Sequence, residues 1–269
     1  MASNLVTNLQ QIPSVMPSVT VQGAYEPFDL QIARTQIMGH SNVNIFGYNA
    51  AQTTTQRAVW ENAGTDYVFP VSAQVMNLVS TNAADTASIL ITGLDANRNN
   101  QTETLILNGT TVVPTIKSYL RINSISVTAG STTNPAGTIT LKNTAGTPNT
   151  ITYAQINAGV GQSQMSIYSV PNGYIFYLTR IDAFSSFNGN NANFINYRNV
   201  NTLSSGVVRQ VAQAAFGPSY RIQRDVPLPM GINADIQFQL GTSAATAAVG
   251  IFVEGYLVQQ DGQALASAI

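Results

Sequence analysis

Residues 87–127 read ASILITGLDANRNNQTETLILNGTTVVPTIKSYLRINSISV, and this stretch decides the fold class. Its apolar residues alternate with small or polar ones in three runs, the first of which contains Ile89 and Ile91. A period of two is typical of strands that bury one face. Turn-forming residues separate the first two runs at positions 93–101, and the pair Asn108-Gly109 after the second run predicts a tight hairpin. The stretch therefore predicts a β-meander whose polar face is neutral.

Runs of the same kind recur along most of the chain. No long segment with the 3.6-residue period of an amphipathic helix lies between them, which favours antiparallel sheets. The predicted fold class is all-β, with two antiparallel β-sandwich domains of a jelly-roll-like kind. The expected strands are residues 67–71, 74–80, 88–92, 104–107, 112–113, 120–127, 138–141, 165–170, 174–187, 193–200, 207–212, 220–223, 236–240 and 248–258.

The chain before the first sandwich is expected to be an extended N-terminal arm, residues 1–65. Pro13, Pro17 and Pro27 interrupt it, and its apolar residues are too sparse for a separate core. An arm of this kind is either disordered or laid along a neighbouring subunit. Its aromatic residues favour the second alternative, because disordered tails are poor in aromatics. These residues, the first candidates for an intersubunit interface, are Phe28, Phe46, Tyr48 and Trp60.

The rest of the chain divides into three expected parts. A segment rich in Gly, Thr, Asn and Pro, residues 143–161, predicts a linker between the two sandwiches. The parts are a first sandwich at 66–145, a second sandwich at 146–260 and a short tail at 261–269. Without residues 1–60 the sandwiches are expected to fold but not to join an assembly.

Charged residues make up only 9% of the sequence, where about 25% is usual, and the formal net charge is −1. Neutral polar residues fill the deficit, which suits a surface buried against neighbouring subunits. The basic residues are few and scattered, so no nucleic-acid partner is predicted. The absence of cysteine excludes disulfides and thiolate–metal sites. The first residues lack a signal-peptide pattern, and no apolar run is long enough for a membrane-spanning helix, so no membrane partner is predicted.

Residues for catalysis or for holding a cofactor are sparse. The single histidine is His40, and no G-x-S-x-G nucleophile pattern occurs. Residues 95–99 match the opening of a calcium loop, but Asn100 and Ile106 stand where such a loop needs Gly and Glu, which favours a plain hairpin loop. The sequence predicts no enzyme, no metal site and no cofactor.

Two arginines and two aromatic residues are further candidates for contacts. Arg121 and Arg180 lie in predicted strands with apolar neighbours, where they are expected to form cross-strand or intersubunit pairs. Tyr168 and Phe187 belong to an aromatic series that could line a carbohydrate platform, although such series more often pack a core.

A series of short motifs, taken in order, resembles structural proteins of tailed-bacteriophage virions, especially those of phages that infect aquatic bacteria. The resemblance covers residues 30–260. Where members of that family often carry an acidic residue, this chain has Ala50-Ala51-Gln52, which weakens any charge-dependent role there. The motifs are FGYN at 46–49, VWE at 59–61, ITGLDAN at 91–97, ETLILNGTT at 103–111, GQSQ at 161–164, IYSVPNG at 167–173 and YLT at 177–179.

This resemblance implies a β-rich, non-enzymatic protein on the outside of a virion that is assembled in the host cytoplasm. The expected role is a capsid decoration or cement protein, a homotrimer bound to the major capsid protein. The alternative is a tail, collar or fibre component that contacts tail or portal-vertex proteins and a host receptor or surface glycan. An enzyme such as a polysaccharide depolymerase is a rival that would need an acid pair.

Overall fold

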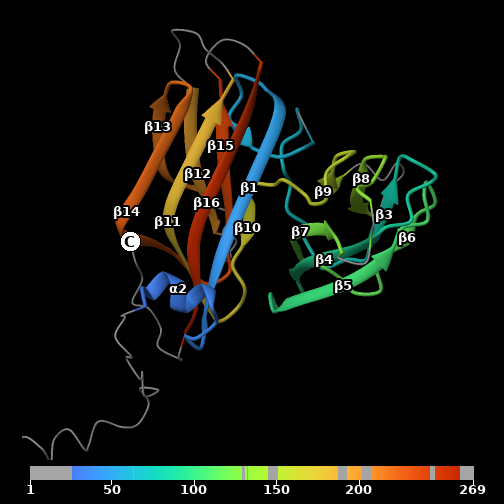
Figure 1. Ribbon diagram of the computed structural model, residues 1–269, viewed down its shortest axis with the longest axis horizontal. Helices are drawn as coiled ribbons and strands as arrows, with labels where there is room; N and C mark the ends of the chain where they lie inside the picture. The colour runs from blue at the N-terminus through green and yellow to red at the C-terminus, as the bar shows by residue number, and fades with distance from the viewer. Residues whose placement is uncertain are drawn as a thin grey trace, which may run out of the picture. The chain divides into compact units, whose positions relative to one another are not determined.

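The computed structural model describes residues 26–62, 64–128, 131, 133–144, 151–186, 193–201, 208–242 and 246–260. The chain forms two compact units, one ending at Met38 and one beginning at Gly39. In the first unit, helix α2 (Phe28–Ala33) follows Pro27 and buries Ile32. The second unit contains only strands as its regular elements within these described ranges, and every strand pair is antiparallel (Figure 1). The all-β fold class is therefore confirmed.

The strands of the second unit fall into two pairs of sheets, each pair enclosing a buried apolar cluster. Most of the strands contain a segment that the sequence predicts, although residues 67–71 form no strand. The strands are β1 (His40–Gln52), β2 (Arg57–Ala58), β3 (Met76–Ser80), β4 (Ser88–Leu94), β5 (Asn100–Ile106), β6 (Val113–Pro114), β7 (Arg121–Val127), β8 (Ile139–Asn143), β9 (Thr152–Ile156), β10 (Ile167–Ser169), β11 (Tyr174–Ser185), β12 (Asn193–Asn201), β13 (Val208–Phe216), β14 (Ser219–Met230), β15 (Ala234–Gly241) and β16 (Ala247–Gln259).

One pair of sheets has jelly-roll topology. Its sheets have the strand orders β1-β16-β11-β14 and β10-β15-β12-β13. If these eight strands are numbered 1 to 8 along the chain, the order in one sheet is 1-8-3-6 and the order in the other is 2-7-4-5. This arrangement is the double Greek key of a jelly roll. Phe176 and Ile251 from the first sheet and Phe238 from the second are fully buried in the shared core. This strand order confirms the jelly-roll expectation for one of the two sandwiches.

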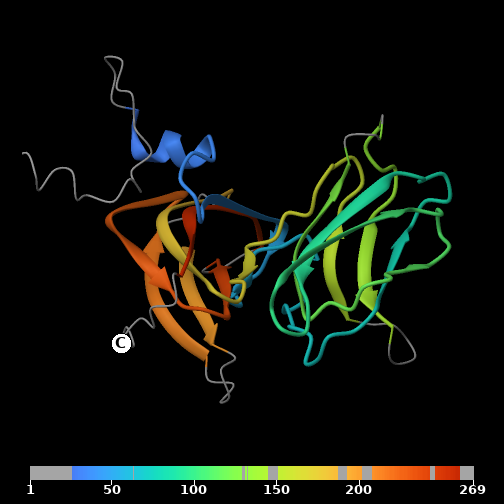
Figure 2. The same ribbon diagram turned by 90° about the horizontal axis from the view of Figure 1, so that it is seen from below.

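The other pair of sheets is inserted into the jelly roll. Strands β3 to β9 lie in the sequence between β1 and β10, the first two strands of the jelly roll, and form a sandwich of sheets β6-β3-β8-β9 and β5-β4-β7 (Figure 2). Leu78, Ile91 and Ile122 are fully buried in its core. The expected boundaries are thus wrong, because the jelly roll is discontinuous in sequence and both sandwiches belong to the unit that begins at Gly39.

Residues 40–62 are part of this folded unit, which corrects the expectation of an arm over 1–65. Strand β1 pairs with β16 over its length, and β2 pairs with β15. Trp60 is 1% exposed and bridges to Met165. The strands that pair with β1 and β2 lie about 180–220 positions away in the sequence, so local composition could not reveal this core. Deleting residues 1–60 would therefore remove an edge strand and part of both cores.

The predicted turns are correct in part. A loop at 95–99 joins the antiparallel pair β4 and β5, as expected. Asn108-Gly109 also forms a turn, with Gly109 at φ +55°, but it leads from β5 to β6 in the other sheet. The order β5-β4-β7 is not a meander either. Likewise, residues 152–156 of the expected linker form β9 of the inserted sandwich.

Candidate functional site

The side chain of Asp235, at the start of β15, lies at the junction of the two sandwiches and is fully buried. Its carboxylate accepts hydrogen bonds from two arginines of the inserted sandwich. Arg98 donates from Nη1 and Nη2 at 3.0 and 2.9 Å, and Arg121 donates from Nε and Nη2 at 2.9 and 2.7 Å. Ser169 of the jelly roll adds an Oγ donor at 2.7 Å. Five hydrogen bonds thus converge on one carboxylate.

The two arginines are held by the local structure around them. Arg98 has φ +61° in the loop after β4, where the Asp95 carboxylate accepts the backbone N–H groups of Asn97 and Asn99 and fixes the turn. The Arg98 guanidinium also donates to the carbonyl of Asn233 at 2.8 Å.

Arg121 is the first residue of β7. Its Nη1 donates to the carbonyls of Pro70 and Leu120, at 2.8 and 2.7 Å. Its guanidinium carbon lies 5.0 Å from the centre of the Phe69 ring, a cation–π arrangement. Both arginines are therefore engaged on several sides.

The carboxylate at the junction is fully engaged by protein donors. Burial by itself raises the pKa of Asp235, but the hydrogen bonds from Arg121 and Arg98 outweigh burial and hold this pKa below its usual value. The carboxylate is ionised at neutral pH, and its lone pairs are directed at protein donors. A general base needs a free lone pair that substrate can reach, so Asp235 is a structural anchor.

A second buried carboxylate, Glu61, supports the chain crossing between β9 and β10. It accepts backbone N–H groups of Asn157 and Gln164 at 3.3 and 3.1 Å, and its own carbonyl accepts the Gln155 side chain. Burial raises the pKa of Glu61 to about 7, although the two backbone donors act in the opposite direction. Glu61 is therefore a group whose charge changes near neutral pH.

A groove of about 520 Å³ runs beside β1. Its wall is mixed, with apolar and aromatic groups such as Phe46 and Tyr168 next to amides and hydroxyls such as Asn44 and Ser126. Among the described residues that line it, none is charged and none is a histidine. The side chains of Asn44 and Ser126 make no hydrogen bond with the part of the chain that the structure describes. The groove thus suits a neutral ligand with its own hydrogen-bonding groups.

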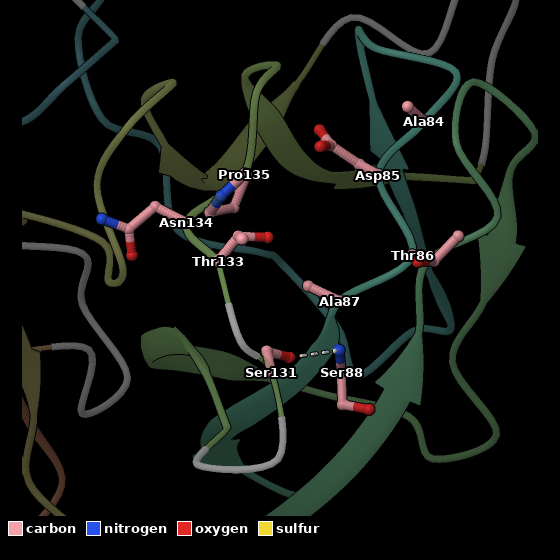
Figure 3. A pocket seen from close by; sticks show the side chains of 9 residues that line it. All are labelled: Ala84, Asp85, Thr86, Ala87, Ser88, Ser131, Thr133, Asn134 and Pro135. Atoms are coloured by element: carbon pink, nitrogen blue, oxygen red, sulfur yellow. Dashed lines mark hydrogen bonds between the residues drawn. The ribbon is translucent and has the colours of Figure 1, made fainter.

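A smaller pocket of about 240 Å³ lies in the inserted sandwich and is bordered by Asp85, Ser88, Ser131 and neighbours (Figure 3). The Asp85 carboxylate is already occupied by the backbone N–H groups of Ala136 and Gly137, at 2.8 and 2.9 Å, and by the Ser80 hydroxyl. Although burial opposes it, these donors lower the pKa of Asp85. Asp85 therefore closes a turn, and the pocket offers no free ionised group for chemistry.

The interface candidates from the sequence fall into two groups. Phe28 is 47% exposed on α2, and Phe46 and Tyr48 are half-buried on β1. Trp60 and Arg121, at 1% and 4% exposed, are inside the chain and cannot anchor a neighbour in this conformation. The sequence near Trp60 and Arg121 shows that their neighbours are apolar. It does not show that other parts of the same chain cover these two side chains.

The remaining candidates lie on the jelly roll. Arg180 is half-buried and pairs with Asp182 and with Glu254, the latter at 3.3 Å, so its cross-strand pairing is confirmed. Tyr168 is half-buried, and its ring centre lies 5.6 Å from that of Phe176, which fits core packing. Phe187 lies outside the described residues.

Asp235, Arg98 and Glu61 were not found from the sequence. The available signal was weak: Asp235 stands inside the apolar strand run ADIQF in a chain with few charges, where a charged residue calls for a buried partner. In the part of the chain described, no group of three or more His, Cys, Asp or Glu could hold a metal ion. Among the described helices, none is long and apolar enough to cross a membrane.

No protein-family model and no curated protein matches this chain. Solved structures that resemble it faintly include the following two. Vicilin from Solanum melongena is 8% identical with a TM-score of 0.10, covering 90% of this chain and 81% of that one. The VP2 subviral particle of infectious bursal disease virus is 9% identical with a TM-score of 0.12, covering 88% and 74%. Both scores are too low to carry an argument about this protein.

Proposed function

We propose that this protein is a structural subunit on the exterior of a bacteriophage particle, acting as a capsid decoration or cement protein. The observation that carries the proposal is the Asp235 junction. It uses Asp235 and Arg121, the two most deeply buried charged residues among those described, together with Arg98, to fasten the inserted sandwich to the jelly roll. A unit that reinforces a shell must transmit force between its contact surfaces without opening, and a buried, multiply bonded junction serves that purpose.

The composition supports the same proposal. With 9% charged residues, the surface is mostly neutral and polar, which favours contacts that cost little desolvation when copies pack together. A jelly roll by itself does not imply a viral role, because the same fold serves unrelated functions. The resemblance to tailed-phage virion proteins supplies the particular context.

The alternative is a tail, collar or fibre component that contacts a host glycan. The outer face of sheet β1-β16-β11-β14 favours it, because Tyr177 of β11 lies directly opposite Tyr256 of β16, and Phe46 of β1 lies opposite Phe252. Aromatic side chains on a sheet face can stack on sugar rings. Binding of the isolated protein to a glycan array, weakened by Tyr177→Ala, would support this alternative.

The deciding experiment is the copy number of this chain relative to the major capsid protein in purified particles, measured by quantitative mass spectrometry. We expect hundreds of copies per particle, as symmetric decoration of a shell requires. A few copies per particle would replace the decoration role with a tail or vertex role. Absence from washed, infectious particles would overturn a structural function altogether.

A further inference from the structure

Strand β1 presents an unpaired edge to the groove beside it. The Gln259 N–H donates to the Gly39 carbonyl, whereas the Tyr48 N–H donates to the Gln164 carbonyl. Backbone groups alternate in direction along a strand, so odd-numbered residues of β1 bond to β16 and even-numbered ones point away. Residues 42–46 therefore direct the N–H and C=O groups of Asn42, Asn44 and Phe46 toward the open side, where no described residue pairs with them.

The opposite edge of the same sheet is protected. The Gln260 N–H donates to the Gly173 carbonyl, which fixes the alternation of β11 so that Tyr177 faces β16. Pro229 lies opposite Tyr177 and therefore turns its nitrogen, which has no hydrogen, toward the open side of β14. Proline at such positions prevents another strand from adding. The edge of β1 has no proline and no charged residue over 41–52.

We propose that this edge accepts an extended strand from residues 1–25 of a second copy of the chain. Those residues contain no Asp, Glu, Lys, Arg or His, which matches the uncharged wall of the groove. Within them, residues 18–22 read SVTVQ and have strand alternation over five positions, the length of the open edge at 42–46. At about 3.3 Å per residue, the 25 residues reach about 80 Å, enough to cross to a neighbour.

An added strand would pair with the free backbone groups of β1 and would also cover the apolar wall of the groove. The added backbone takes the free groups of Asn42, Asn44 and Phe46, as in other cases of β-augmentation. Side chains alternate between the two faces, so Val19 and Val21 lie together on one face, where the apolar wall formed by Ile45, Met165, Ile167 and Leu257 can receive them. The inference deepens the proposed function, on which it rests, by naming how one copy holds the next.

The test compares the full chain with a variant that begins at Glu26, since every described element lies after residue 25. Molar mass is measured by light scattering. Amide exchange is measured by mass spectrometry resolved to single residues, at Asn42, Asn44 and Phe46, because Val43 and Ile45 are already bonded to β16. We expect the full chain to be oligomeric with slow exchange at these amides. The shortened chain should be monomeric with fast exchange, and a synthetic peptide of residues 1–25 should restore the slow exchange.

A matched pair of edge variants sharpens the test. Asn44→Pro removes an outward-facing donor without touching the β1–β16 ladder, so it should weaken peptide binding at least about tenfold, the value of one hydrogen bond, while the melting temperature is kept. Gln223→Pro, at an outward position on β14, is the control and should leave peptide binding unchanged.

Three results would overturn the inference. Fast exchange at the amides of Asn42, Asn44 and Phe46 in the oligomer would mean that copies associate elsewhere. A monomer with slow exchange at these amides would mean pairing within one chain. Slow exchange restored by neutral oligosaccharides but not by the peptide would make the groove a sugar site. None of these results bears on the copy number in particles, so failure of the inference remains distinct from failure of the proposed function.

Discussion

Replacing Asp235 by Asn should destabilise the protein far more than the loss of a charge from an exposed ion pair. Asn keeps the size of the side chain but removes the negative charge between Arg98 and Arg121, whose side chains are 10% and 5% exposed. Removing one partner of a buried ionic group costs about 3–5 kcal/mol, because the remaining charges stay buried without compensation. At about 2–4 °C per kcal/mol, the melting temperature should fall by about 6–20 °C.

The assay is thermal unfolding followed by circular dichroism at pH 7, with Asp182→Asn as the matched control. Asp182 also bonds two arginines, Arg180 and Arg221, but its side chain is 23% exposed, so its loss should cost only about 0–1 kcal/mol. The pH dependence gives a second readout. Because the pKa of Asp235 is lowered in the folded state, its stabilisation is complete above about pH 4 and is lost as the pH falls through the folded pKa.

The difference in stability between wild type and Asp235→Asn should therefore be constant from pH 7 to about pH 5 and should shrink in stronger acid. A melting temperature for Asp235→Asn within about 2 °C of the wild-type value, equal to that of the control, would refute the reasoning. It would mean that the junction is hydrated or open in solution.

Three further predictions concern Glu61, Gly255 and Trp60, which lie outside the Asp235 junction. Because the pKa of Glu61 rises from 4.5 to about 7 on folding, the free energy of unfolding should fall as pH rises through this interval, and Glu61→Gln should abolish the slope in urea titrations at successive pH values. Gly255→Ala would place a Cβ 2.4 Å from a backbone oxygen of β11, so it should lower the free energy of unfolding in urea by about 1–3 kcal/mol. Gly250→Ala is the control and should cost less, because the obstacle there is the half-exposed Phe184 ring, which can move. Trp60→Ala should lower the free energy of unfolding of the monomer by about 3–5 kcal/mol in urea titrations, because Trp60 is buried within a single chain. Equal stability of wild type and variant would contradict its place in the core.

Local pattern was enough to predict most of the strands, but not β1, β2 or β9. Alternation in runs such as residues 88–92 and 248–258 is a property of neighbouring residues, and each run lies within an observed strand. The low charge and the lack of cysteine are likewise visible without any structure. Most of the candidate site could not be predicted from the sequence. Arg121 was identified as a pairing residue, but its partner Asp235 and its burial were not predicted.

The sequence by itself determined the all-β class and most strand positions, because a period of two needs only adjacent residues to specify it. Only the tertiary structure decided which strands pair, that β1 and β16 close one jelly roll around an inserted sandwich, and that Asp235 meets Arg98 and Arg121 from 137 and 114 positions away. Alternation specifies which face of a strand is buried but not its partner. The partner is chosen by how whole sheets fill their cores and satisfy buried charges, and those contacts join residues that no local window contains.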